Sequence, residues 1–418
     1  YKSISGEEYA LFQRKKGCQY YDQCQAYKNA DVLIFNSQKY LLETIIGRKP
    51  YTDLDIIDEC DEFLDNFANE KRLNLNRLHS SLSSLFPANR EDKNAIKEMI
   101  KKINDILYGD RTNEIKKLNT STLIELFNLI LKNPYIAEDE DRSYYNTAFE
   151  IAKSFEPLFD ESYIRYTSQE QKGLFGSAKE DLQVDIVSIN LSRSLQEIID
   201  ANNILILMSG TLHSQQVLQD IFGLKHFKII DAETTNPGTI SKYRTGLEKN
   251  CKYANFKSGN VTRQDYLQAF SACLKNAEKP TLVHVNAFQD LPSKEEKIAL
   301  NLDIITREEL REKQQNNTYI NKFKQGDIDL LFTTKCSRGV DFPGDKCKSV
   351  ILTKYPYPNV KGLFWEILKK EQPEKFMEFY LDKARRELLQ KIYRAVRSKD
   401  DHVFLLSPDV RVLNANLK

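Results

Sequence analysis

Two groups of charged residues have the types and spacing needed for nucleotide hydrolysis. Adjacent carboxylates, Asp58 and Glu59, follow a short apolar run. There, one could orient Mg²⁺ through water and the next could take a proton from the attacking water. Gln390, Arg394 and Arg397 are spaced by four and three residues, so a helix would place them on one face. Two arginines presented together can stabilise the charge on a transferring γ-phosphoryl group. The structural alternatives are a charged corner of a loop and a solvated basic helix face.

A turn between two apolar runs carries a third group of polar residues. The runs 330–332 and 350–352 predict strands. Open α/β sheets bind ligands at the carboxyl ends of their strands, and the polar residues follow the first run directly. They are Thr333, Thr334, Arg338, Gly339 and Asp341. The structural alternative is a tight loop in which the glycine only provides backbone geometry.

Ser209-Gly210-Thr211 follows another apolar run, 204–208. Small hydroxyl residues at this position could couple a nucleotide site to a neighbouring groove. A helix N-cap before the sequence LHSQQVLQDIF is at least as compatible with the pattern. The chain contains no Gly-Lys-Ser/Thr run that would form a phosphate-binding loop. We therefore expect either no nucleotide hydrolysis or a phosphate-binding part that lies upstream of Tyr1.

The elements that must position these residues alternate between strands and helices, which predicts a mostly parallel sheet. Strands are expected at 31–37, 54–57, 162–167, 182–191, 204–208, 227–230, 281–285, 330–334, 349–353 and 403–406. Helices are expected at 38–46, 266–277 and 364–397. Between about residues 62 and 155, apolar residues recur at helical spacing with almost no strand signal. Within this region, Thr122 and Glu125 could form a capping box before a helix that Pro134 ends. The pattern predicts two α/β domains, the first interrupted by a helical insertion.

Composition sets the broad class of protein. The chain has 418 residues, with 61 Lys and Arg against 60 Asp and Glu, so any basic surface must be local. The longest apolar runs are too short to cross a bilayer, and we expect no membrane partner. Seven scattered cysteines favour a reducing cytoplasm over a disulfide framework. Cys18 and Cys24 alone cannot complete a four-thiolate metal site, so free thiols are the better interpretation from spacing.

Taken in order, six segments resemble the XPD/DinG family of iron–sulfur superfamily 2 DNA helicases. DIIDECDEF is similar to the Walker B segment of the family, and ILMSGTL to its motif III. TLVHVNAFQDL resembles the first strand segment of the second motor domain. CSRGVDFPGD and KYPYPN resemble motif V and its sequel, and QKIYRAVRSKDD is similar to motif VI. The resemblance covers nearly the whole chain.

The resemblance implies a role for each candidate residue. Asp58 would hold Mg²⁺ through water and Glu59 would activate the attacking water, while Arg394 and Arg397 would reach the γ-phosphate of ATP. The residues implied to line the nucleotide site are Gly339, Asp341 and Gln390. The residues implied to contact DNA or couple it to the nucleotide are Asn36, Ser209, Gly210, Thr211, Thr333, Thr334 and Arg338. Cys18 would be the last ligand of a 4Fe-4S cluster, which we expect in a full-length protein and not in this chain alone.

The resemblance also implies a domain plan and a function. The fold would comprise two RecA-like parallel-sheet motor domains, the first interrupted by an all-helical Arch-like insertion. The expected parts are the end of the cluster region (1–30), the first motor domain (31–66 and 161–221), the insertion (67–160) and the second motor domain (222–418). The implied function is an ATP-dependent, 5′-to-3′ DNA helicase acting as a monomer on single-stranded or forked DNA.

Several departures from the family pattern keep a second hypothesis open. Cys60-Asp61 replaces Ala-His of the Walker B segment, and Tyr393 replaces the glycine of motif VI. Neither the phosphate-binding loop nor the first three cluster cysteines has a counterpart in the chain. The alternative is therefore a DNA-binding, helicase-like protein that has lost ATP hydrolysis. The presence of Asp58 and Glu59 together with both arginines favours the enzyme.

Overall fold

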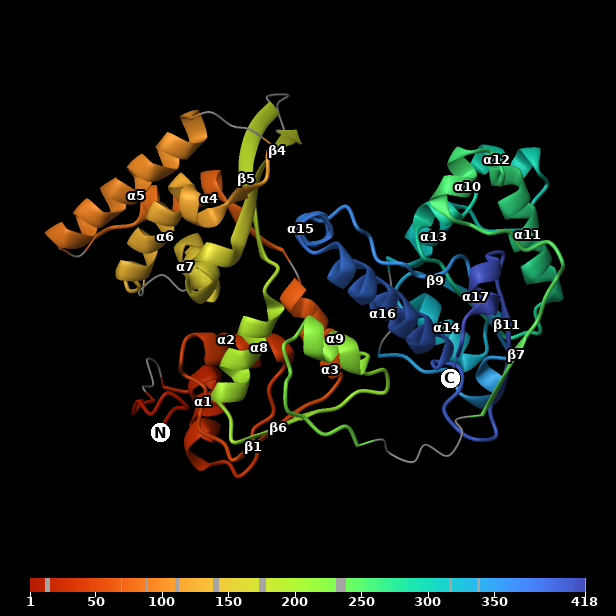
Figure 1. The fold of residues 1–418 in the computed structure, drawn as a ribbon, viewed down its shortest axis with the longest axis horizontal. Helices are drawn as coiled ribbons and strands as arrows, with labels where there is room; N and C mark the ends of the chain where they lie inside the picture. The colour runs from red at the N-terminus through yellow and green to blue at the C-terminus, as the bar shows by residue number, and fades with distance from the viewer. Residues whose placement is uncertain are drawn as a thin grey trace. The chain divides into compact units, whose positions relative to one another are not determined.

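The computed structural model describes residues 1–418 except 12–15, 69, 88, 110–112, 138–142, 173–177, 231–237, 316–317, 337–338 and 418. The described residues divide into two units (Figure 1). The first unit consists of Tyr1–Lys225 with Asn359–Glu378, and the second of His226–Pro358 with Phe379–Lys418. No helix among these residues is long and apolar enough to cross a membrane.

The second unit is built on a parallel five-stranded sheet with the order β7-β11-β10-β8-β9. Its strands are β7 (Thr239–Lys242), β8 (Thr281–His284), β9 (Leu330–Thr333), β10 (Ser349–Leu352) and β11 (His402–Leu406). The four predicted strands from 281 onward are confirmed. Sequence reasoning missed β7 and placed a strand at 227–230, where the structure has none and where Ile230 is 77% exposed.

Both faces of this sheet are buried, as is usual for parallel sheets. Successive strand residues such as Leu282 and Val283 belong to two different apolar clusters, because neighbouring side chains on a strand point to opposite faces. One cluster includes residues of α14 (Thr318–Gln325), α16 (Pro373–Ile392) and α17 (Val410–Asn414). The other includes residues of α11 (Arg263–Asn276) and α13 (Arg307–Lys313). The remaining short helices of this unit are α10 (Tyr253–Lys257) and α12 (Lys294–Ala299).

The first unit contains a two-stranded parallel sheet, β1 (Leu54–Ile57) with β6 (Ile204–Leu207). Both strands are confirmed. One face of the sheet is apolar and open in the described chain, because Ile56 is 55% exposed and Ile204 is 57% exposed. The helices near these strands in sequence are α1 (Gln19–Asn29), α2 (Ser37–Ile45), α3 (Cys60–Asp65), α8 (Leu191–Asp200) and α9 (Gln215–Asp220).

The predicted strand at 31–37 is wrong, and the predicted helix that follows is confirmed. Residues 31–36 form no strand, and Val32 and Ile34 are 76% and 94% exposed. The run therefore has no strand partner among the described residues, and only part of it is packed, with the Phe35 ring against the Tyr27 and Tyr40 rings. Asn36 ends it by accepting a hydrogen bond from the Lys39 backbone N–H at the start of α2.

The region between β1 and β6 holds a helical body, as expected, but it also contains strands. Its helices are α4 (Leu75–Ser84), α5 (Arg90–Tyr108), α6 (Thr122–Lys132) and α7 (Tyr144–Phe155), which share one apolar core. An antiparallel sheet with the order β2-β5-β4-β3 packs beside them (Figure 1). Its strands are β2 (Lys71–Asn74), β3 (Lys116–Lys117), β4 (Ser162–Lys172) and β5 (Ala178–Ser188).

This sheet corrects the expectation of an all-helical insertion ending at residue 160. Strand β5 pairs with β2 and β4 pairs with β3, so the hairpin after residue 160 hydrogen-bonds to strands of the insertion and not to β1 or β6. The predicted capping box is also absent, because Thr122 is the first residue of α6 and Ser121 occupies the N-cap position without a side-chain cap bond. Helix α15 (Leu363–Glu371) completes the first unit.

Candidate functional site

The paired carboxylates stand at the carboxyl end of β1 and are both exposed. Glu59 has left-handed backbone geometry (φ 49°) and precedes α3. Its backbone N–H donates to Asp58 Oδ1 over 2.9 Å. Left-handed geometry costs a residue other than glycine about 1 kcal/mol, and such strain often occurs at functional sites. The turn presents both carboxylates at the strand end, where ligands bind in open α/β sheets.

Asp61 joins this acidic turn to the Ser209–Thr211 segment, a contact that sequence reasoning missed. The side chain of Asp61 is fully buried. It accepts hydrogen bonds from Ser209 Oγ at 2.7 Å and from Thr211 Oγ1 at 3.2 Å. The Cys60 backbone N–H also donates to the Met208 carbonyl. Gly210 lies between the two hydroxyl residues, and a side chain there would meet no atom within 4 Å. Charged hydrogen bonds from Ser209 and Thr211 to Asp61 therefore connect the two segments.

In the second unit, the Asp341 carboxylate binds both candidate arginines. Asp341 Oδ1 accepts from Arg394 NH1 at 2.9 Å and from Arg397 NH2 at 2.5 Å. Arg394 is buried, whereas Arg397 is exposed. Partial burial opposes ionisation of Asp341, but the two guanidinium groups outweigh it and lower the pKa of this carboxyl. The arrangement fixes two cations side by side, as recognition of a phosphate would require.

The prediction that Gln390, Arg394 and Arg397 share one helix face is wrong. Helix α16 ends at Ile392, so only Gln390, which is buried, lies on it. The backbone after the helix is satisfied by other partners. The Arg394 carbonyl accepts from the Phe342 N–H, and the N–H groups of Arg397 and Ser398 donate to Asp401 Oδ2. The arginines are therefore brought together by tertiary contacts instead of helical spacing.

Tyr393, which stands where the motif VI pattern has glycine, does not displace the two arginines from Asp341. The Tyr393 hydroxyl donates to the Leu417 carbonyl at 3.1 Å, and the ring packs against the apolar cluster that contains Leu388 and Ile392. The ring is therefore accommodated by the core and the C-terminal segment, while Asp341 still holds both arginines.

The other candidates of the turn after β9 differ in burial and in hydrogen bonding. Gly339 has positive φ (73°), which glycine tolerates best. Thr333 is buried, and its Oγ1 is bonded inside the turn to Cys336 and to the Lys335 N–H. Because its hydroxyl is buried and bonded within the turn, Thr333 is not placed for the DNA contact that the resemblance implies. Thr334 Oγ1 donates to Gln314 Oε1. Arg338 lies outside the described residues.

Asn36 and Cys18 are the remaining first-unit candidates. Asn36 is exposed, and its side chain caps α2. Cys18 occupies the N-cap position of α1 as a free, half-buried thiol. Within the described part of the chain, no group of three or more His, Cys, Asp or Glu residues is arranged to hold a metal ion. Cys18 thus has no described co-ligands for a cluster.

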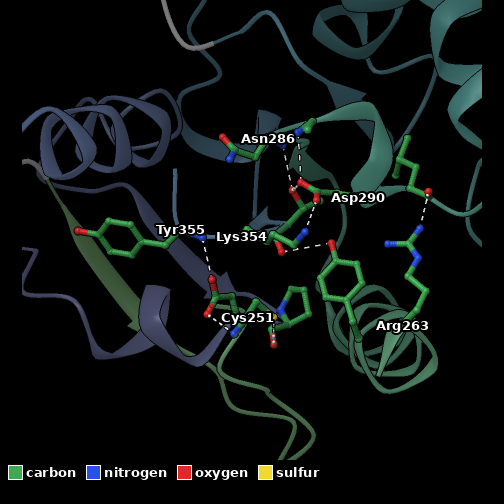
Figure 2. A network of polar contacts seen from close by, with 12 residues as sticks. Cys251, Arg263, Asn286, Asp290, Lys354 and Tyr355 are labelled. Carbon is green, nitrogen blue, oxygen red and sulfur yellow. Dashed lines mark hydrogen bonds and ion pairs between the residues drawn. The ribbon is translucent and has the colours of Figure 1, made fainter. Parts of the chain in front are cut away.

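A polar network that the sequence did not reveal lies where the crossover direction of the second sheet reverses. The chain leaves β8 toward β9 on one side and returns to β10 on the other, and ligands of open sheets bind at such switch points. Asp290 accepts hydrogen bonds from Thr353 Oγ1 and the Ala287 N–H and forms an ion pair with Lys354 at 2.6 Å (Figure 2). Thr353 Oγ1 in turn accepts from the Asn286 N–H.

The network leaves the Asn286 side chain exposed beside the carboxyl end of β8. Lys354 also lies over the rings of Phe256 and Tyr266, at 5.3 and 5.0 Å from their centres. The Asn286 Oδ1 accepts from Lys391 Nζ at 3.5 Å, and an exposed amide with a neighbouring ammonium group suits contact with a nucleic-acid backbone. These residues follow predicted strands, which is a signal that the sequence does contain. Their spacing in the sequence, however, did not indicate that they form one cluster.

The C-terminal part of the chain matches a known protein family. Residues 252–418 match the family described as the helicase C-terminal domain. The protein named "3'-5' exonuclease DinG" of Staphylococcus aureus (strain MSSA476) is 22% identical over 319 residues, covering 73% of this chain and 34% of that protein. Its namesake in Staphylococcus epidermidis is 22% identical over 320 residues, covering 73% and 33%. The chain thus spans about a third of the length of the curated relatives that it matches.

Two of the solved structures that the chain matches carry XPD names. The structure named "Structure of S. tokodaii Xpd4" has a TM-score of 0.48 and 18% identity, covering 90% of this chain and 76% of that chain. The structure named "XPD_APO" has a TM-score of 0.45 and 15% identity, covering 85% and 72%.

Proposed function

We propose that this chain, which is of the XPD/DinG type of superfamily 2 helicases, binds single-stranded DNA and supplies two parts of an ATP-hydrolysing site. Asp58 and Glu59 would provide the carboxylates of that site, and Arg394 and Arg397 would provide its guanidinium groups. The observation that carries the proposal is the arginine pair held by Asp341 within the segment that matches the helicase C-terminal domain.

The residues fit the cofactors that such a reaction uses. The exposed carboxylate of Asp58 suits a Mg²⁺ ion held through water, and the metal would neutralise phosphate charge. Glu59 would take a proton from the attacking water, and the arginines would stabilise charge on the γ-phosphoryl group. The bonds from Ser209 and Thr211 to Asp61 would link hydrolysis to DNA held by the first unit. Translocation would run 5′ to 3′, by resemblance to the family.

The proposed function includes neither an iron–sulfur cluster nor nuclease activity. Among the described residues, Cys18 has no co-ligands that could complete an iron–sulfur cluster. The curated relatives carry an exonuclease name, but a metal-dependent nuclease needs clustered acidic or histidine ligands. The described residues present no such cluster.

The central test concerns Glu59 in the longest protein that the gene encodes. Reading the coding sequence ahead of Tyr1 should reveal a Gly-Lys-Ser/Thr loop. Glu59→Gln in that protein should abolish ATP hydrolysis while single-stranded DNA binding persists, because the amide cannot take the proton. The exposed Glu62 on α3 offers a matched control, and Glu62→Gln should retain activity. Unchanged hydrolysis in Glu59→Gln would refute the assignment of the base.

The alternative function, DNA binding without hydrolysis, makes the opposite prediction. Under that hypothesis no preceding phosphate-binding loop exists, and neither Glu59→Gln nor Arg394→Ala changes any measured activity. For residues 1–418 alone, we expect DNA binding without DNA-stimulated ATP hydrolysis. An oligonucleotide-stimulated release of phosphate by this chain would contradict that expectation.

A further inference from the structure

A pocket lies at the carboxyl ends of β10 and β11 in the second unit, and two of its residues, Tyr355 and Tyr357, come from the KYPYPN segment, for which the resemblance implied no residue role. Its volume is about 460 Å³, within the range of roughly 300–1,000 Å³ typical of small-ligand sites. The lining residues are Tyr355, Tyr357, Arg385, Arg411, Asn414, Ala415 and Asn416. The lining thus combines aromatic rings, guanidinium groups and amides without a carboxylate.

The aromatic wall of the pocket is a fixed stack of rings. The Tyr355 and Tyr357 ring centres are 4.7 Å apart, and Tyr357 stacks on Tyr380 at 5.1 Å with 14° between the planes. Figure 2 shows the Tyr355 ring pointing away from the Asp290 network. Tyr355 therefore lines the pocket as one of three tyrosine rings in contact.

The base of the pocket is built around Asp409, which is fully buried. The Tyr355 backbone N–H donates to Asp409 Oδ2 at 3.0 Å, which fixes the backbone that carries the ring (Figure 2). Arg411 pairs with the same carboxylate at 2.6 Å and donates to the Cys251 carbonyl. Its guanidinium carbon also lies 5.2 Å from the Tyr357 ring centre. Arg411 thus neutralises Asp409 at the base of the pocket, and Arg385 adds a second guanidinium group to the lining.

The polar groups of the pocket suit a nucleotide. Arg385 is exposed on α16, where it can contact a phosphate. Asn414 Oδ1 accepts from Arg244 NH2 at 2.7 Å, and its amide nitrogen carries two donors that can reach the edge of a base. Stacking on an aromatic ring together with a nearby cation is the usual mode of binding to single strands, and it tolerates any base.

We infer that this pocket is a base-stacking subsite for single-stranded DNA. One base stacks on Tyr355 and the adjoining phosphate pairs with Arg385. The inference rests on the proposed DNA-binding function and gives Tyr355 and Arg385 a role that the family resemblance did not imply. The polar network around Asn286 lies at the end of the neighbouring strand β8. A strand of DNA could therefore pass from the crossover reversal to the pocket along one edge of the sheet.

The first arm of the test uses the unaltered chain and changes only the DNA. Fluorescence anisotropy measures binding of a labelled oligo(dT) of about fifteen nucleotides, near the upper end of single-strand site sizes. An oligonucleotide of equal length with abasic sites should bind about fivefold more weakly or worse, because its bases cannot stack. Free dTMP should compete far less well than oligo(dT). Competition by dTMP as strong as that by oligo(dT) would overturn the inference in favour of a free-nucleotide site.

The second arm uses matched variants in the pocket. Tyr355→Leu should weaken oligo(dT) binding about fivefold or more and should bind abasic DNA as the unaltered chain does. Tyr355→Phe keeps the ring and should bind within about twofold of the unaltered chain. Arg385→Ala should reduce the slope of log K against log salt by about 0.7, as expected for one lost contact to a single-strand phosphate.

Lys346→Ala is the charge control, because Lys346 is exposed and precedes β10, at the opposite end of that strand from Tyr355. It should leave the salt slope unchanged. If the chain binds oligo(dT) but neither abasic DNA nor Tyr355→Leu changes the affinity, the subsite is refuted and the proposed function stands. If the unaltered chain binds no DNA, the proposed function itself fails. Should Tyr355→Leu not fold, the abasic comparison on the unaltered chain decides the question.

Discussion

Asp401 provides the sharpest test of how the second unit positions Arg397. Its side chain is 6% exposed. Oδ2 accepts the N–H groups of Arg397 at 2.6 Å and Ser398 at 2.7 Å, and Oδ1 accepts the Gly344 N–H at 2.9 Å. One carboxylate thus holds three backbone donors of two loops. The change Asp401→Asn keeps the size of the side chain but replaces one acceptor oxygen with an NH₂ group.

The expected loss of stability follows from counting donors. In the cheaper amide orientation, the carbonyl oxygen keeps the bonds to Arg397 and Ser398, and the Gly344 N–H faces the NH₂ group. Leaving one buried donor without a partner costs about 1–3 kcal/mol, and the two remaining bonds lose their charged acceptor. We therefore expect Asp401→Asn to lower the free energy of unfolding of the second unit by about 2–4 kcal/mol.

Hydrogen exchange of the Arg397 and Ser398 amides reads this effect directly, measured by mass spectrometry on peptides that cover them. A loss of about 2 kcal/mol or more corresponds to exchange about 30-fold faster or more. Asp400→Asn is a matched control, because Asp400 is adjacent, exposed and carries the same charge. It should change stability by less than about 0.5 kcal/mol. Equal exchange rates in the two variants would refute the reasoning, because they would show that the Asp401 bonds do not hold the loop.

The pH dependence provides an independent check on the same carboxylate. Burial opposes ionisation of Asp401, but the three N–H donors outweigh it and lower its pKa below that of an unfolded chain. A lowered folded-state pKa contributes stability above about pH 4, the pKa of an unfolded aspartate, and this stability is lost as the pH falls through the folded value. The difference in unfolding free energy between the unaltered chain and Asp401→Asn should therefore be constant near neutral pH and shrink below about pH 4.

Three further predictions concern other parts of the molecule. Asp61→Asn should lower the unfolding free energy by about 1–3 kcal/mol, because one of the two acceptors for Ser209 and Thr211 is lost; in a double-mutant cycle with Ser209→Ala, additive effects would contradict the coupling. Burial lowers the pKa of His284 to about 3, so its NMR shifts should not titrate between about pH 5 and 8, and the folded state should lose stability as the pH drops below about 6.5, because the unfolded chain binds the proton there and the folded chain does not. Leu78→Ala, in the core of the helical body, should cost about 2–5 kcal/mol and shift the urea transition of the single tryptophan in α15, whereas Asp401→Asn should leave that transition in place.

The sequence alone determined the order of the strands that carry motifs and the type of fold. Apolar runs at 281–285, 330–334, 349–353 and 403–406 each became a strand of the second sheet, because a buried parallel strand needs little more than a short run of apolar residues. Helical periodicity marked the insertion for the same local reason. The adjacency of Asp58 and Glu59 is likewise a local property, so the turn at the end of β1 was predictable.

The tertiary structure alone decided which residues meet. Asp61 bonds to Ser209 across 148 residues, and Asp341 pairs with arginines 53 and 56 residues later. Helix α16 ends before those arginines because Asp401 and the Phe342 N–H satisfy the backbone that follows. The strands after residue 160 pair within the insertion because register depends on partners far away in the chain. Spacing fixes neighbours within one element, whereas these contacts depend on how separate elements satisfy each other's charges and hydrogen bonds.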